Sequence, residues 1–202
     1  NGPVRAQIVG LTDEAKEAQA ERVKEFMNYQ IMVEMKEYEP EFDQMLFDLP
    51  LAGSTFKKVY YDQTLMRCVS KFVPAEDLVV PYSATSLEDA DSIMHIIKMS
   101  ANDLRKQQVS EFYRDIDIGE SSYEADDVED KKAELDGASV NNRDEVHTLI
   151  ECHVDLDLHG FEDKDEEGEP TGIKLPYIVT LVEGSGEVLA IRRNFNPQDP
   201  TR

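Results

Sequence analysis

The stretch IECHVDLDLH, Ile150–His159, decides the fold. Polar and apolar residues alternate along it, and its apolar positions are Ile150, Cys152, Val154, Leu156 and Leu158. A repeat of two places apolar side chains on one face of a strand and polar side chains on the other. The stretch therefore predicts a β-strand that is buried on one face only.

Two more strands are predicted on the C-terminal side of this stretch, at Leu175–Glu183 and Glu187–Arg193. The residues Gly184-Ser185-Gly186 between them are typical of a hairpin turn. Residues 143–193 are therefore predicted to form an antiparallel β-meander. Residues 194–202, which include two prolines, are expected to be a tail leading to an absent remainder of the protein.

The N-terminal side is predicted to be helix-rich. Apolar residues recur at helical spacing over 11–37, with Thr12 as the expected cap and Pro40 as the expected stop. A short second helix is predicted from Glu41 until Pro50 closes it. A strand is predicted at Ser54–Tyr61, followed within 69–80 by two short strands flanking a turn at 74–77.

Two further helices are predicted at 86–97 and 101–111. In each, a serine precedes an aspartate by three residues, as in a variant of the capping box. These pairs are Ser86 with Asp89 and Ser100 with Asp103. The whole of 1–116 is thus interpreted as one helix-rich α+β portion.

The segment 117–142 differs in kind. Its part Asp117–Asp136 carries nine acidic residues and two lysines. Such a run predicts an acidic, mobile connection rather than a packed element. The fold class that follows is α+β, with N-terminal helices and short strands, this connection, and the C-terminal meander.

Composition excludes several classes of function. The chain has 202 residues, 43 acidic against 21 basic, and a net charge of −22. A field of this sign repels phosphate backbones and anionic lipid surfaces, which argues against a nucleic-acid reader and a membrane binder. Only Cys68 and Cys152 are present, so no disulfide framework is expected and both thiols are expected to be reduced.

The N-terminal residues show no secretory signal pattern, and no apolar run is long enough to span a bilayer. We therefore expect a soluble protein that is intracellular when it is made.

The acidic stretch that begins at Asp163 resembles a calcium loop only superficially. Lys174 stands at position twelve, where a bidentate acid is needed, and Pro170 interrupts the loop. The flanking elements are predicted strands, not helices. An EF-hand is excluded, and an acidic hairpin loop is predicted instead.

One strand face carries His153, Asp155, Asp157 and His159, whose side chains could ligate a divalent metal. Alternate residues on a strand lie about 7 Å apart, so four in line cannot converge on one ion. A pair completed by ligands from elsewhere stays open, beside a plain solvent-facing surface. His95 is expected to be packed or interfacial, and His147 has no evident partner.

The chain lacks the sequence motifs of the common hydrolases, metalloproteases and nucleotide-binding enzymes. Cys152 and His153 are neighbours that would point to opposite faces of a strand. We single out no catalytic, cofactor-binding or metal-ligating residue, and we expect a protein that is not an enzyme.

Six stretches in order resemble tailed-phage portal proteins. They are VKEFMNYQI (Val23–Ile31), FDQMLFDLPLAGSTFKKVYYD (Phe42–Asp62), KFVPAEDLVVPYSATSLEDADSIMH (Lys71–His95), KMSANDLRKQQVSEFYRDI (Lys98–Ile116), ECHVDLDLHGFED (Glu151–Asp163) and KLPYIVTLVEGSGEVLAIRRNFNPQDP (Lys174–Pro200). The similarity is to the podovirus, P22-like subgroup and its prophages, and it covers nearly the whole chain. It is weakest over Asp117–Asn142.

The resemblance implies a fragment from the N-terminal half of a portal, within its wing. The parent would be a dodecameric ring at the capsid vertex, through which double-stranded DNA passes without sequence-specific binding during packaging and ejection. Its implied partners are other portal subunits and the capsid or scaffolding protein. The terminase and head–tail adaptor would bind regions outside this fragment. The implied location is the virion, and the host cytoplasm during assembly.

Within this interpretation, the predicted helices of 11–37 and 86–111 are the expected packing elements between subunits. The exposed ends of the sheet in 150–193 are a second candidate. Two other classes stay open, namely a different virion module such as an adaptor or scaffold-interacting protein, and a metal-dependent hydrolase that uses the His153–His159 face.

Overall fold

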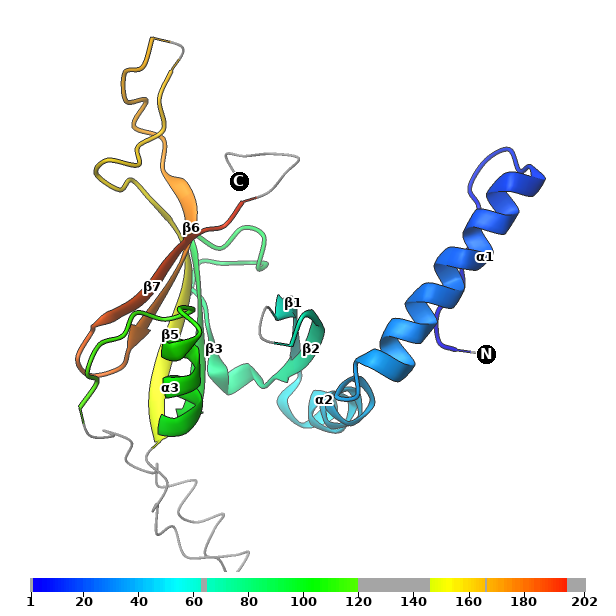
Figure 1. Cartoon of the computed structure of the whole chain (residues 1–202), viewed down its shortest axis with the longest axis horizontal. Coiled ribbons are helices and arrows are strands. Elements are labelled where there is room, and N and C mark those ends of the chain that lie inside the picture. The colour runs from blue at the N-terminus through cyan, green and yellow to red at the C-terminus, as the bar shows by residue number, and fades with distance from the viewer. Residues whose placement is uncertain (1, 63–64, 120–145, 166, 196–202) are drawn as a thin grey trace, which may run out of the picture. The chain divides into compact units, whose positions relative to one another are not determined.

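A computed structural model describes residues 2–62, 65–119, 146–165 and 167–195 (Figure 1). The chain forms two compact units, Asn1–Glu76 and Asp77–Arg202. The α+β fold predicted from the sequence is confirmed, with helices early in the chain and antiparallel strands late. The boundary between the units lies within the portion 1–116 that the sequence analysis treated as one.

The N-terminal unit begins with an extended arm and two helical segments. Helix α1 spans Glu14–Tyr29 and continues as a π-helix, η1, over Gln30–Glu34. The cap is Asp13 rather than the predicted Thr12, because the Asp13 carboxylate accepts a hydrogen bond from the Lys16 backbone N–H at 2.8 Å. The single helix predicted over 11–37 therefore starts later and ends at Met35.

Helix α2 spans Tyr38–Ala52, so the predicted second helix exists, but it includes Pro40 and continues past Pro50. Pro40 lies in the first turn of α2, where the missing N–H costs nothing because no intrahelical acceptor is available there. Pro50 lies in the last turn. The helix ends at Gly53, which adopts a left-handed conformation (φ 79°) and donates its N–H to the Leu49 carbonyl.

A two-stranded antiparallel hairpin completes the N-terminal unit. Strand β1, Phe56–Asp62, pairs with β2, Arg67–Val73, in a register that sets Val59 opposite Ser70. The strand predicted at 54–61 is thus confirmed. A 3₁₀ turn, η2 (Ala75–Asp77), then leads to β3 (Leu78–Val79), so the two predicted strands of 69–80 exist but belong to different sheets.

The C-terminal unit is built on an antiparallel sheet in the order β3-β4-β5-β6-β7. Its other strands are β4 (Ser92–Ser100), β5 (Val146–Leu156), β6 (Leu175–Val182) and β7 (Val188–Arg193). Consecutive strands β5 to β7 form the predicted meander. Helix α3, Ala101–Val109, contributes Leu104 to a core that also contains Leu149 and Leu189, both fully buried.

The predicted helix at 86–97 is wrong, because residues 92–100 form β4. This strand pairs with β5 over nine residues, and the β-branched residues Ile93, Ile96 and Ile97 suit such a position. Ser86 does accept a hydrogen bond from the Asp89 N–H at 3.2 Å, but the bond closes a turn. The equivalent pair Ser100 and Asp103 caps α3, as predicted.

Candidate interaction surface

The histidines of the predicted metal face do not converge. Strand β5 ends at Leu156, so Asp157 and His159 lie beyond it. His153 is hydrogen-bonded to Glu151 (3.0 Å) and His159 to Glu162 (3.1 Å). Within the part of the chain that the structure describes, no group of three or more His, Cys, Asp or Glu side chains could hold a metal ion.

The other two histidines occupy the sheet. His95 lies half-buried on β4 rather than on a helix, opposite Glu151 of β5. His147 lies inside β5 and is buried, whereas the sequence placed it before the strand. Both histidines are thus part of the strands of the C-terminal sheet.

The acidic stretch after Phe161 forms a hairpin loop, as predicted. Lys164 and Pro170 make an isolated antiparallel bridge. Asp165 Oδ1 accepts hydrogen bonds from the N–H groups of Glu167 and Glu169 at 2.9 and 3.0 Å, which folds the loop onto one carboxylate. The Asp165 carboxylate thus stabilises the loop itself through these two hydrogen bonds.

The two cysteines lie in different units, and both are free thiols. Burial raises the pKa of the Cys152 thiol, and the nearby Glu151 carboxylate raises it further. A raised pKa lowers the fraction of thiolate at neutral pH, so Cys152 is poorly suited to nucleophilic attack.

One end of the C-terminal sheet is covered by the segment that follows α3. The Arg114 N–H donates to the Leu189 carbonyl at 2.9 Å, on the outer edge of β7. The Arg192 guanidinium lies over the Phe112 ring, 3.5 Å from its centroid, and also donates to the Phe112 carbonyl. An open hollow of 810 Å³ lies here. Its two arginines, Arg114 and Arg192, bond the segment after α3 to strand β7.

The helices of the N-terminal unit expose most of their apolar side chains. No residue of α1, η1 or α2 is buried, and every residue of these helices is described. Phe26, Phe47 and Leu51 are 59%, 71% and 75% exposed. We call the following set the N-terminal apolar surface: Val23, Phe26, Met27, Tyr29, Met32, Val33, Phe42, Leu46, Phe47, Leu49 and Leu51. Exposed apolar side chains mark an interaction site where they form a contiguous patch.

Charge is distributed unevenly between the two units. Residues 1–76 contain nine basic and thirteen acidic residues, a net charge of −4, which leaves −18 of the total of −22 for residues 77–202. A surface that binds another protein is depleted in charge at its centre. The helices α1, η1 and α2 themselves contain nine acidic and three basic residues, so the low net charge of the unit comes from the basic residues outside them.

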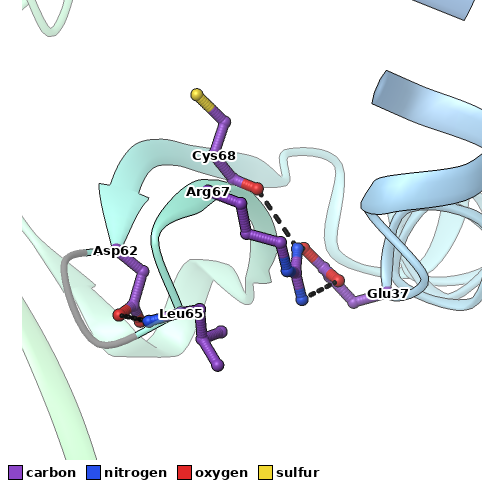
Figure 2. Close-up of polar contacts among 5 residues, drawn as sticks. All are labelled: Glu37, Asp62, Leu65, Arg67 and Cys68. Atoms are coloured by element: carbon purple, nitrogen blue, oxygen red, sulfur yellow. Dashed lines mark hydrogen bonds and ion pairs between the residues drawn. The ribbon is translucent and has the colours of Figure 1, made fainter. Parts of the chain in front are cut away.

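An ion pair fixes the hairpin to the start of α2 (Figure 2). Arg67 donates from both guanidinium nitrogens to the Glu37 carboxylate, at 2.7 and 2.9 Å. The Arg67 guanidinium lowers the pKa of Glu37. Arg67 also donates to the Cys68 carbonyl at 3.2 Å, and Asp62 accepts from the Leu65 N–H in the turn between the strands.

A lysine attaches the other strand to the same helix. The Lys57 ammonium lies 4.0 Å from the Tyr38 ring centroid and 5.0 Å from that of Phe42, and these rings stack on one another. Burial lowers the pKa of Lys57, although the Glu41 carboxylate acts in the opposite direction. The hairpin is thus held on α2 by a cation–π contact and an ion pair, beside the burial of Val69 and Val73 on β2.

No known protein family matches the chain, and no curated protein matches it significantly. In the described residues, no helix has the length and apolar character needed to cross a bilayer.

Sequence analysis located part of this surface. It named the helix of 11–37 as a packing element, and that region contributes Val23 through Val33 to the N-terminal apolar surface. It named the predicted helices of 86–111 as well, but in that region residues 92–100 form strand β4. It predicted a second helix from Glu41 to Pro50 on the apolar spacing of Phe42, Leu46 and Leu49, but it did not name that helix as a packing element.

Proposed function

We propose that this chain is a structural segment of a tailed-phage portal protein, whose full-length form assembles as a ring at the capsid vertex. The observation that carries the proposal is the N-terminal apolar surface, on helices that bury no residue of their own. A subunit whose apolar side chains are covered by its neighbours would have this appearance as a single copy.

The distribution of charge supports the same role. The strongly acidic C-terminal unit would not hold DNA that slides past it. Capsid or scaffolding protein would be a further partner. The terminase and adaptor would contact parts of the parent outside these residues, and the location would be the virion.

The mass of the full-length protein in solution tests the proposal. Light scattering on protein purified without DNA should give a mass of about a dozen subunits, with sedimentation independent of added nuclease. A mass of one or two subunits at high protein concentration would contradict a portal role and would favour a different virion module.

A further inference from the structure

The two edges of the β1–β2 hairpin differ. The outer edge of β2 is occupied by side chains of the same unit: the Phe72 N–H donates to Glu41 Oε2 at 2.7 Å, and the Ser70 N–H donates to the Glu37 carboxylate. The Cys68 carbonyl on that edge accepts from Arg67. Glu37 and Glu41 are one helical turn apart, a spacing that matches alternate residues of a strand.

The pairing register then shows which groups of β1 face outward. Residues directly opposite one another in an antiparallel pair point their backbone groups the same way, either both inward or both outward. Cys68, Ser70 and Phe72 point outward, and their partners are Tyr61, Val59 and Lys57. In the described residues, the backbone groups of these three β1 residues make no hydrogen bond on the outer side.

The same unit contains an unpaired extended segment. Residues Arg5–Val9 precede α1, and the segment is held at Val4, whose N–H and C=O bond the Asn28 side chain at 2.9 and 3.1 Å. No backbone hydrogen bond involves Arg5–Val9 among the described parts of the chain. Val9 is 96% exposed, although Ile8 and Val9 are residues that favour strands.

We propose that Arg5–Val9 of one copy adds as a strand to the outer edge of β1 in a second copy. The two segments match in length, since the free edge also runs over five residues, Lys57–Tyr61. Main-chain bonds of this kind supply affinity wherever an extended segment meets an open sheet edge. The proposal goes beyond the portal role, because it needs only two copies that meet.

In the described residues the segment does not make this contact within its own copy. It runs alongside α1, to which Asn28 ties it, whereas β1 follows after α2 in the same unit (Figure 1). Each copy therefore offers one strand and one edge. Two copies that exchange arms form a closed pair, whereas copies that each bind the next one form a ring or a filament.

Charge selects the antiparallel orientation. Pairing Lys57 with Val9, Val59 with Gln7 and Tyr61 with Arg5 keeps the two cations at opposite ends and places the Arg5 guanidinium across from an aromatic ring. The parallel alternative would set Arg5 beside Lys57, and like charges directly opposite destabilise a strand pair.

Amide hydrogen exchange on the full chain, at low and high protein concentration, tests the proposal. The Lys57, Val59 and Tyr61 amides should be protected only at high concentration, by about tenfold when nine-tenths of the copies are paired. Lys58 and Tyr60 should be protected at both concentrations, since their amides face β2. Equal, rapid exchange of the first three amides at both concentrations would overturn the proposal.

Two proline variants identify the pairing segments. Val59→Pro removes an outward N–H from the edge, and Gln7→Pro does the same in the arm; an edge position tolerates proline because its N–H bonds nothing within the copy. Each should abolish the concentration-dependent protection, whereas Val59→Thr, which keeps the N–H, should preserve it. Val59→Pro protein with an unchanged pattern would refute the role of the edge.

A mixture of the two proline variants distinguishes arm addition from direct pairing of two β1 strands. The Val59→Pro copy keeps an intact arm and the Gln7→Pro copy an intact edge, so mixing should restore protection of Val59 in the Gln7→Pro copy. The complexes should stop at two copies. If Gln7→Pro alone keeps wild-type protection, the arm is not the added strand. These outcomes do not depend on whether the full-length protein forms rings.

Discussion

Glu37 is the residue on which the hairpin depends most directly. Its carboxylate receives both arms of the Arg67 guanidinium and the Ser70 N–H, and its side chain is only 19% exposed. Bidentate, charge-assisted bonds are stronger than ordinary ones because both oxygens are used in a fixed geometry. The ion pair thus adds to the burial of Val69 and Val73 on β2.

Replacing Glu37 by Gln should lower the free energy of unfolding by about 1–2 kcal/mol at pH 7, since the charged partner is lost. Urea denaturation measures the change, and Glu39→Gln, an exposed acid in the same turn, is the matched control. If both variants unfold at the same urea concentration as the wild type, the ion pair does not stabilise the hairpin.

The same pair predicts a pH dependence. The pKa of Glu37 lies below its ordinary value of 4.5 in the folded chain, so its contribution is complete above that value. It is lost as the pH falls through the lowered pKa, because the protonated carboxyl no longer pairs with Arg67. Denaturation curves from pH 5 downward should show this loss in the wild type and not in Glu37→Gln; parallel slopes would contradict it.

At the scale of elements, a local sequence signal predicted the right element where the tertiary contacts favour the same structure. The alternation in 150–158 predicted β5, and the Ser100–Asp103 pair predicted the start of α3. The same serine–aspartate spacing at Ser86 failed, because pairing with β5 turned 92–100 into a strand. The open edge of β1 could not be predicted, since nothing in its own residues says that Glu37 and Glu41 cover the opposite edge.

A single glycine, Gly53, forms the C-terminal cap of α2. Gly53 has φ 79°, and a Cβ there would meet nothing within 4 Å, so only backbone strain opposes substitution. Gly53→Ala should lower the free energy of unfolding by about 1 kcal/mol. Gly53→Asn should cost less, because asparagine adopts this conformation more readily. Thermal or urea unfolding gives both values, and an alanine variant as stable as the wild type would contradict the left-handed cap.

The arm should be released by loss of Asn28. Asn28→Ala removes two hydrogen bonds of about 1 kcal/mol each, and alanine keeps helix α1 intact because it is a better helix former than asparagine. Trypsin should therefore cleave after Arg5 on the order of tenfold faster. Asn28→Asp keeps the acceptor for the Val4 N–H and should lie between. Unchanged cleavage in Asn28→Ala, timed by mass spectrometry, would show that other contacts hold the arm.

At the scale of the whole chain, the two units differ in how much apolar surface they bury. The C-terminal unit has a buried core around Leu149 and Leu189, whereas α1, η1 and α2 bury no residue. Sequence analysis found the overall charge and the α+β class. It could not find the difference between the units, because an apolar stripe on a helix has the same pattern whether a core or another copy covers it.

The most direct test is negative-stain electron microscopy of the full-length protein, purified without DNA, as wild type, Phe47→Glu and Phe161→Glu. Phe47 belongs to the N-terminal apolar surface, and Phe161 is an equally exposed phenylalanine of the C-terminal unit, at 71% and 72%. Leu51→Glu serves as a second surface variant, with circular dichroism to confirm that helices are retained. We expect rings with a central channel from the wild type and Phe161→Glu, and separate subunits from Phe47→Glu and Leu51→Glu. Discrete wild-type monomers or dimers at high concentration, or intact rings in both surface variants, would contradict the account.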